Sequence, residues 1–460
     1  MTENTSKSFE KKCLPKLSQT NANAAGIDVG ARRHYVAVPP DRDQEPVRSF
    51  GCLTPELHSM AKWLKACGIE TVAMESTGVY WIPVVYVLEQ YGLHVSLVNA
   101  RHVKHVPGRK SDVQDCQWLQ ELHTFGLLSG GFRPAPEIRT LRAYWRQRDN
   151  LVESSSQQIH RMQKALEQMN LQLHKELSDI MGITGQQIIR AIVKGERDPV
   201  VLARMKHPLV KSPEHVLAQA LTGTYAEEHV FALKQSLELY DVYQQKISEC
   251  DQQTEQAMLR LTSKSEDTPK TSPPPKKLSG KRRKNQPHFD LRTQQYRITG
   301  VDLTQIDGIS AMTAQTIIAE CGIDMSLYPS EKNFSSWLGL CPNNKITGGK
   351  VYSSRTRKVS NRASSSLRLA AQSLHRSSSA LGAYYRRMKS RHGAPKAITA
   401  TAHKLAKLIY RMLKFGKDFV DKGQSYYEAR YKEQAVKNMI KRAKQIGYEL
   451  VPLPDPMLVS

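Results

Sequence analysis

The feature that most constrains this chain is a short apolar segment near its start that carries one acidic residue. Ala24–Val29 reads Ala-Ala-Gly-Ile-Asp-Val, a composition typical of a strand inside a sheet. An ionised Asp28 in such a strand costs free energy unless it is paired or binds a metal ion. The segment therefore indicates a sheet that holds a functional carboxylate.

Three further acidic residues are spaced to join Asp28. Glu75 follows the apolar run Thr71–Met74, and Asp112 and Asp115 lie three residues apart on one face of a predicted helix. Carboxylate oxygens are the ligands that Mg²⁺ prefers, and Mg²⁺ supports phosphodiester chemistry. The pattern predicts a magnesium site, with the metal-binding and catalytic acids Asp28, Glu75, Asp112 and Asp115.

The order of predicted elements around these acids is typical of an RNase H/RuvC-like α/β domain. Two or three antiparallel strands come first and are followed by strand, helix, strand and helix. In that order the first and fourth strands are neighbours, so Asp28 and Glu75 should meet at the sheet. We expect strands at 24–29, 34–38, 47–53, 70–74 and 94–98, and helices at 54–67, 80–91 and 111–125.

Composition restricts the partners and the compartment. The 460 residues carry a net charge of +24, which favours a polyanion such as nucleic acid over a membrane surface. The seven cysteines include no Cys-x-x-Cys pair, so neither a disulfide framework nor a zinc ribbon is indicated. No signal peptide or membrane-spanning run is apparent, and we expect a cytoplasmic protein.

A basic segment precedes the second acidic pair. It is predicted to contact phosphate, the alternative being a solvated loop. Oxygen donors suit Mg²⁺ better than imidazole does, so His102 and His105 are not assigned as metal ligands. The nucleic-acid contacts predicted here are Arg101, Lys104, Arg109 and Lys110.

Two long helices are predicted at 137–174 and 226–260. From Val152 onward the first carries apolar residues at heptad spacing. The seam fits either an antiparallel hairpin within one chain or an intermolecular coiled coil, and its narrowness favours the latter slightly.

Between the helices and the carboxy-terminal region, residues 262–292 form a basic linker that contains three consecutive prolines and is expected to be disordered. Residues 303–314 then predict a helix-hairpin-helix around Gly308, whose second helix can hold a phosphate; a plain helical corner is the alternative. The predicted division of the chain is a disordered arm 1–22, a RuvC-like domain 23–130, a coiled-coil segment 135–261, the linker, a mostly helical transposase-type domain 296–415 and a helical tail 416–460.

The segment 334–366 is the second stretch with chemical potential. Thr347 precedes Gly348-Gly349 and is surrounded by cations, the setting that a hydroxyl nucleophile attacking phosphorus requires. The alternative is a basic turn that only binds phosphate. The cations predicted to contact nucleic acid are Lys345, Lys350, Arg355, Arg357 and Lys358.

Taken in order, these motifs resemble the DEDD transposases of the insertion sequence 110 family. The resemblance rests on Gly26-Ile27-Asp28, Glu75-Ser76-Thr77-Gly78, the Asp112/Asp115 pair, the Gly-Ile-Ser hairpin and Trp-Leu-Gly-Leu-Cys-Pro before Gly-Gly-Lys. It implies a DNA recombinase that uses Mg²⁺, works as a dimer to tetramer and is guided by a structured bridge RNA.

The resemblance also implies a serine nucleophile in the carboxy-terminal domain, which forms a covalent link to DNA. That serine corresponds to Thr347, which keeps the hydroxyl but adds a methyl group. Ser353 and Ser354 are alternative nucleophiles. The leading hypothesis is an RNA-guided DNA transposase; the alternatives are a RuvC-like junction nuclease that uses metal-activated water, and a catalytically silent nucleic-acid-binding scaffold.

Overall fold

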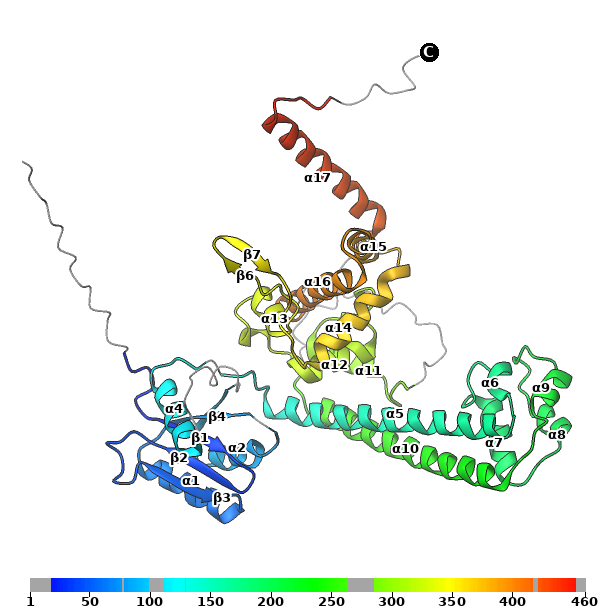
Figure 1. Cartoon of the computed structure of the whole chain (residues 1–460), viewed down its shortest axis with the longest axis horizontal. Coiled ribbons are helices and arrows are strands. Elements are labelled where there is room, and N and C mark those ends of the chain that lie inside the picture. Colours follow the sequence, from blue (N-terminus) through cyan, green and yellow to red (C-terminus); the bar gives the residue numbers. More distant parts are fainter. Residues whose placement is uncertain are drawn as a thin grey trace, which may run out of the picture. The chain divides into compact units, whose positions relative to one another are not determined.

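The chain divides into two compact units, residues 1–133 and 134–460, and each is described by itself. A computed structural model provides the coordinates, shown in Figure 1. The residues that it describes are 18–76, 78–98, 111–128, 130–263, 285–416 and 421–451.

The first unit contains a five-stranded mixed sheet in the order β3-β2-β1-β4-β5. Strands β1 and β2 and strands β2 and β3 pair antiparallel, whereas β1 and β4 and β4 and β5 pair parallel. This is the predicted RNase H-like order. The strands are β1 Ala24–Val29, β2 Arg33–Ala37, β3 Val47–Gly51, β4 Thr71–Glu75 and β5 His94–Val98.

Alternation along β1 assigns its side chains to two different layers. Ala25 and Ile27 belong to the apolar core that the sheet forms with helices α1 (Thr54–Ala66) and α2 (Trp81–Gln90). Gly26 and Asp28 face the opposite side, where α4 (Asp112–Thr124) packs. The sheet thus lies between two helical layers, and the acidic residue of β1 is on the side of α4.

The second unit begins with two long helices, α5 (Pro136–Gln168) and α10 (Glu227–Leu259), which pack against each other within the chain. The heptad positions Ser155, Met162 and Leu166 of α5 are buried there. The expected seam therefore exists, but α10 of the same chain fills it, contrary to the favoured intermolecular packing. Small helices cap the pair at α6 Leu173–Glu176, α7 Ile183–Val193, α8 Pro199–Arg204 and α9 Glu214–Ala220.

A buried ion pair joins the two long helices. Arg148 of α5 and Asp251 of α10 are 1% and 2% exposed, and Arg148 Nε donates to Asp251 Oδ1 at 2.5 Å. Arg148 also donates to the carbonyl of Asn285, and the backbone N–H of His288 donates to Asp251 Oδ2. These bonds satisfy two charges that would be costly if left unpaired.

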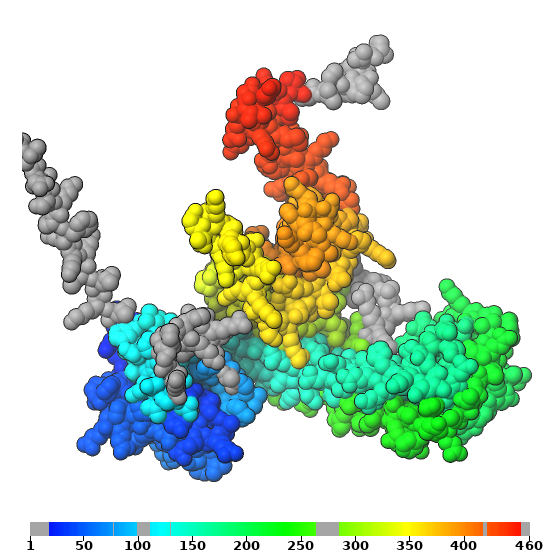
Figure 2. Space-filling view, in the orientation of Figure 1, coloured from blue at the N-terminus to red at the C-terminus, as the bar shows by residue number. Residues whose placement is uncertain are grey.

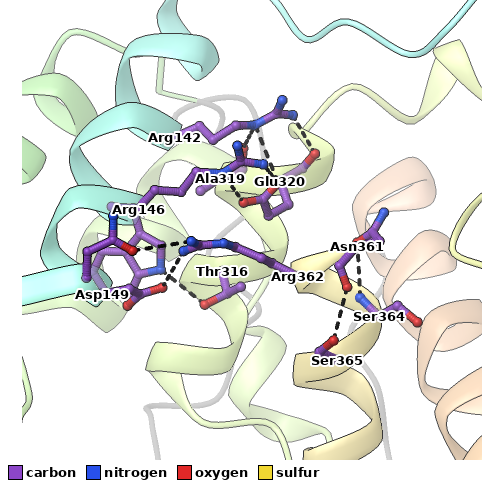
Figure 3. Close-up of polar contacts among 12 residues, drawn as sticks. Arg142, Arg146, Asp149, Thr316, Ala319, Glu320, Asn361, Arg362, Ser364 and Ser365 are labelled. Carbon is purple, nitrogen blue, oxygen red and sulfur yellow. Dashed lines mark hydrogen bonds and ion pairs between the residues drawn. The ribbon is translucent and has the colours of Figure 1, made fainter. Parts of the chain in front are cut away.

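The amino-terminal half of α5 is bound to α12 (Ala311–Cys321), as Figure 3 shows. Arg146 makes a bidentate contact with the buried carboxylate of Glu320, and Arg142 donates to the carbonyls of Ala319 and Glu320 at the end of α12. The helical hairpin and the carboxy-terminal helices therefore form one folded unit.

The predicted helix-hairpin-helix differs from the structure in its first half. Residues Leu303–Gln305 form a single 3₁₀ turn (η1), and only the second element, α12, is a regular helix. Gly308 has φ +86°, and a Cβ there would approach the carbonyl oxygen of Ala370 to 2.9 Å. This glycine is required by the left-handed backbone and by close packing on α14 (Arg362–Ser373), so its presence needs no bound phosphate.

The remainder of the unit is mostly helical, as predicted. None of the helices in the described ranges is long and apolar enough to cross a membrane. The six cysteines within those ranges are free thiols. The remaining elements are α11 Leu291–Thr299, η2 Met325–Leu327, α13 Glu331–Trp337, β6 Lys345–Thr347, β7 Lys350–Ser353, η3 Leu374–Arg376, α15 Ala380–His392, α16 Ala394–Phe415 and α17 Gly423–Gln445.

Candidate catalytic site

Asp28 and Glu75 lie at the carboxyl ends of two neighbouring parallel strands. The register pairs Ile27 of β1 with Met74 of β4, so the next residue of each strand is one of the two acids. Both side chains are half-buried. Ligand sites of open α/β sheets form at such carboxyl ends. The sheet thus brings together two of the predicted site residues that lie far apart in the sequence.

Helix α4 adds the other two acids from above β1. A Cβ on Gly26 would lie 2.3 Å from both the carbonyl oxygen of Cys116 and the backbone nitrogen of Gln120. The helix backbone therefore rests directly on the strand, which is possible only because residue 26 has no side chain. This close approach places the first turn of α4 beside Asp28.

Asp112 and Asp115 occupy the first turn of α4, where Ser111 is the N-cap and accepts from the N–H of Gln114. Acidic residues are stabilised at a helix N-terminus by its exposed amides, so part of their placement is explained by helix formation alone. Asp112 is exposed and Asp115 is half-buried.

The electrostatics of Asp28 show that the four carboxylates interact. Burial raises the pKa of Asp28 from 3.8 to about 6, and repulsion from Asp112, Asp115 and Glu75 adds to the rise. Of the main contributions, only a hydrogen bond with the backbone of Val29 acts in the opposite direction. A set of oxygen donors that repel one another fits a hard divalent cation. Nevertheless, no three His, Cys, Asp or Glu side chains in the described ranges are grouped closely enough to hold an ion.

Thr347 lies in the second unit, on the antiparallel ribbon of β6 and β7. Gly348 and Gly349 form its two-residue turn with φ values of 55° and 74°, as in a type I′ turn. A Cβ on either glycine would have nothing within 4 Å, so the positive φ, rather than lack of space, favours glycine there. Figure 2 shows the ribbon in yellow, projecting from the surface of its unit.

Lys350 pairs with Thr347 across this turn, so their side chains are neighbours on one face of the ribbon. Both are exposed, as is Lys345, which pairs with Ser353. Arg355 and Lys358 are exposed beyond β7. Arg357 donates to the carbonyl of Ser336 at the end of α13, so it has a structural contact of its own.

The predicted phosphate contacts Arg101, Lys104, Arg109 and Lys110 lie outside the described residues, as do His102, His105 and most of the basic linker. Sequence reasoning missed the role of Gly26 in seating α4. It also missed that no Asp or Glu occurs from Lys332 to Lys417, a signal that counting alone would have found.

Two family models match this chain. The model for IS110-type DEDD transposases matches residues 25–171, and the model described as "Transposase IS116/IS110/IS902 family" matches residues 302–386. A search among curated proteins found no similar sequence. The two matches together span about half of the chain and include all four acids and Thr347. The chain therefore belongs to the IS110 family of DEDD transposases.

Proposed function

We propose that this transposase cuts and exchanges DNA strands with an active site made from two parts, a carboxylate site in the first unit and a hydroxyl nucleophile in the second. The observation that carries the proposal is the convergence of Glu75, Asp112 and Asp115 on Asp28, expressed in the raised pKa of that residue. Repulsion of this kind is typical of sites that bind a cation.

In this proposal the acids Asp28, Glu75, Asp112 and Asp115 hold Mg²⁺. The bound ion would supply positive charge at the scissile phosphate. The residues themselves set the position of that charge: Asp28 and Glu75 through the rigid sheet, and Asp112 and Asp115 through the start of α4. Protonation of Asp28 weakens the site, since a neutral carboxyl is a poor ligand.

Thr347 is the proposed nucleophile. Its oxygen forms a bond to phosphorus as the bond between phosphorus and one strand oxygen breaks, and the released oxygen takes up a proton as a strand hydroxyl. Lys350 and Lys345 offset negative charge that develops on the phosphate oxygens. Exposure at the turn of a ribbon gives Thr347 access to DNA. The added methyl group restricts χ1, so we expect slower attack than from serine.

RNA guidance and assembly into a dimer or tetramer are the remaining parts of the proposal. Family membership and the net charge of +24 support a nucleic-acid partner beyond the cut DNA. A RuvC-like nuclease is the second candidate, favoured by one observation: all four acids belong to one unit that lacks Thr347. Such an enzyme would attack with water and need no hydroxyl.

The test is to incubate the protein with Mg²⁺, element-end DNA and RNA transcribed from the flanks of the element, and to resolve covalent protein–DNA adducts by denaturing gel. Wild type and Thr347→Ser should form adducts, and Thr347→Ala should not. The matched variants Ser353→Ala and Ser354→Ala should retain them. Adducts that persist in Thr347→Ala but vanish in Ser353→Ala or Ser354→Ala would reassign the nucleophile.

The same reactions separate the alternatives. Cleavage that persists in Thr347→Ala but is lost in Asp28→Ala identifies a nuclease that uses water. Binding without cleavage by wild type, with and without RNA, identifies a scaffold. Adducts that form equally well without RNA would contradict RNA guidance while leaving the chemistry intact.

A further inference from the structure

Residues 332–417 of the second unit contain nineteen Lys and Arg residues and no Asp or Glu. The cations of this stretch must therefore find partners elsewhere. Lys407 and Arg411 contact Glu331, the last acid before the stretch, and Arg362 contacts Asp149 of α5. Arg386 donates to the carbonyls of His375 and Ser377.

Arg387 of α15 and Lys404 of α16 have no such partner. Neither makes an ion pair with a carboxylate in the part of the chain that the structure describes, and both are half-buried. Their contacts are with aromatic rings. We call the set formed by Arg387, Lys404, Tyr384, Tyr427 and Tyr431 the cation cluster.

The geometry of the cation cluster is compact. The guanidinium carbon of Arg387 lies 3.8 Å from the ring centre of Tyr431 and 5.3 Å from that of Tyr427. Lys404 Nζ lies 3.8 Å from the ring centre of Tyr384 and 5.9 Å from that of Tyr427. The two cations therefore share the ring of Tyr427, and both interact with rings rather than with an anion.

Two observations indicate that the cation cluster lacks a partner. Burial lowers the pKa of Lys404, and repulsion from Arg387 and Lys407 lowers it further, so the folded protein disfavours this charge. In addition, the Nε of Arg387 and the hydroxyl of Tyr427 are buried without a hydrogen-bond partner in the described ranges. Buried polar groups are normally paired, and unpaired groups call for an explanation.

We propose that the cation cluster binds a backbone phosphate of a nucleic-acid strand. A phosphate would neutralise both cations at once, by a forked contact from Arg387 and a point contact from Lys404. Tyr431, which is 38% exposed, offers a ring beside the phosphate on which a base can stack.

The inference rests on the nucleic-acid-binding part of the proposed function, not on the chemistry of Thr347. It assigns this role to residues that the family match does not reach, since that match ends at residue 386 and only Tyr384 of the cation cluster precedes this point. The competing explanation is structural: Tyr427 and Tyr431 belong to α17, so the rings and cations hold that helix on α15.

Lys404→Met separates the two explanations, because it removes the charge and keeps an apolar side chain of similar length. Binding of labelled single-stranded DNA, duplex DNA and RNA of equal length is measured by fluorescence anisotropy over a series of salt concentrations. We expect about 5- to 10-fold weaker binding of at least one of them, and a slope of log affinity against log salt that is smaller by about one. The melting temperature of the free protein should stay the same or rise.

The control is Lys396→Met, which removes an exposed lysine of the same helix. An equal loss in the control would show only diffuse attraction and overturn the proposal. Unchanged affinity and slope in Lys404→Met, together with a lower melting temperature, would establish the structural clamp instead. If wild type binds none of the three nucleic acids, the proposed function fails as well, so the two failures are distinguishable. Arg387→Lys should behave as an intermediate case, because it keeps the charge and loses the fork.

Discussion

The acid site of the first unit and the cation cluster of the second are electrostatic opposites. Around Asp28 carboxylates repel one another, and the pKa of Asp28 rises; around Lys404 cations repel one another, and the pKa of the lysine falls. In both regions the folded chain supplies too little opposite charge of its own. The comparison teaches that each region is arranged for a ligand of the sign it lacks, a metal ion in one case and a phosphate in the other.

Replacement of Asp28 by Asn should have the largest effect on this comparison. The amide cannot provide a charged ligand, so we expect strand cleavage and transfer to fall by about three orders of magnitude or more. Gel assays of DNA cleavage at saturating Mg²⁺ measure the loss. A variant that retains more than a tenth of the wild-type rate would show that the acid site is not the site of chemistry.

Gly26→Ala should break the acid site without touching an acid. The added Cβ meets backbone atoms of α4 at 2.3 Å, so the helix must move, and we expect a loss of about 3 kcal/mol in the free energy of unfolding. Gly92→Ala is the control: its φ is +70° but its Cβ would contact nothing, so we expect about 1 kcal/mol. Urea unfolding compares them, and equal losses would refute the importance of the close helix approach.

Asp28→Asn should stabilise the metal-free protein while it destroys activity. The folded pKa of about 6 exceeds the model value of 3.8, so wild type loses stability as pH rises from about 4 through 6, and the Asn variant does not. After allowance for solvent screening at this half-buried site, we expect the variant to be more stable by about 1–2 kcal/mol above pH 7. The difference should vanish below pH 4. Thermal melts without Mg²⁺ at pH 4 and pH 8 test this, and lower stability at pH 8 would contradict it.

Glu331→Gln tests the one carboxylate that borders the acid-free stretch. Hydrogen bonds from Arg411 and Lys407 lower the pKa of Glu331 from 4.5 to about 2. Its contribution to stability is therefore present above pH 4.5 and lost as pH falls through 2. We expect the variant to lose about 1 kcal/mol at pH 7 and to approach wild type near pH 2. Denaturation followed at both pH values checks this, and a constant difference would point to lost packing instead.

The sequence was sufficient for the fold around Asp28. Apolar runs, each ending near an acid, indicated the strand order, and β1 and β4 are neighbours as predicted. It was insufficient for the partner of the α5 seam, because a heptad pattern shows that Met162 and Leu166 need a helix against them but not which helix supplies it. Gly308 misled for a related reason: the same glycine serves a phosphate-binding turn or close packing on Ala370.

The candidate site divides in the same way. The identities of Asp28, Glu75, Asp112 and Asp115 could be predicted because carboxylates at strand ends and on one helix face are rare without function. Gly26 could not be recognised as the seat of α4, since only the tertiary structure shows which backbone lies above it. Likewise, nothing in the sequence distinguishes Lys404, which lacks a partner, from Lys407, which has one.

The buried pair of Arg148 and Asp251 has a practical consequence for dissecting this protein. The first family match stops at residue 171, after α5 but before α10. A fragment cut there would carry the guanidinium of Arg148 into an apolar seam whose counter-charge had been removed. The segment recognised by homology and the segment able to fold alone thus end at different residues, and a soluble amino-terminal fragment should stop at Arg133.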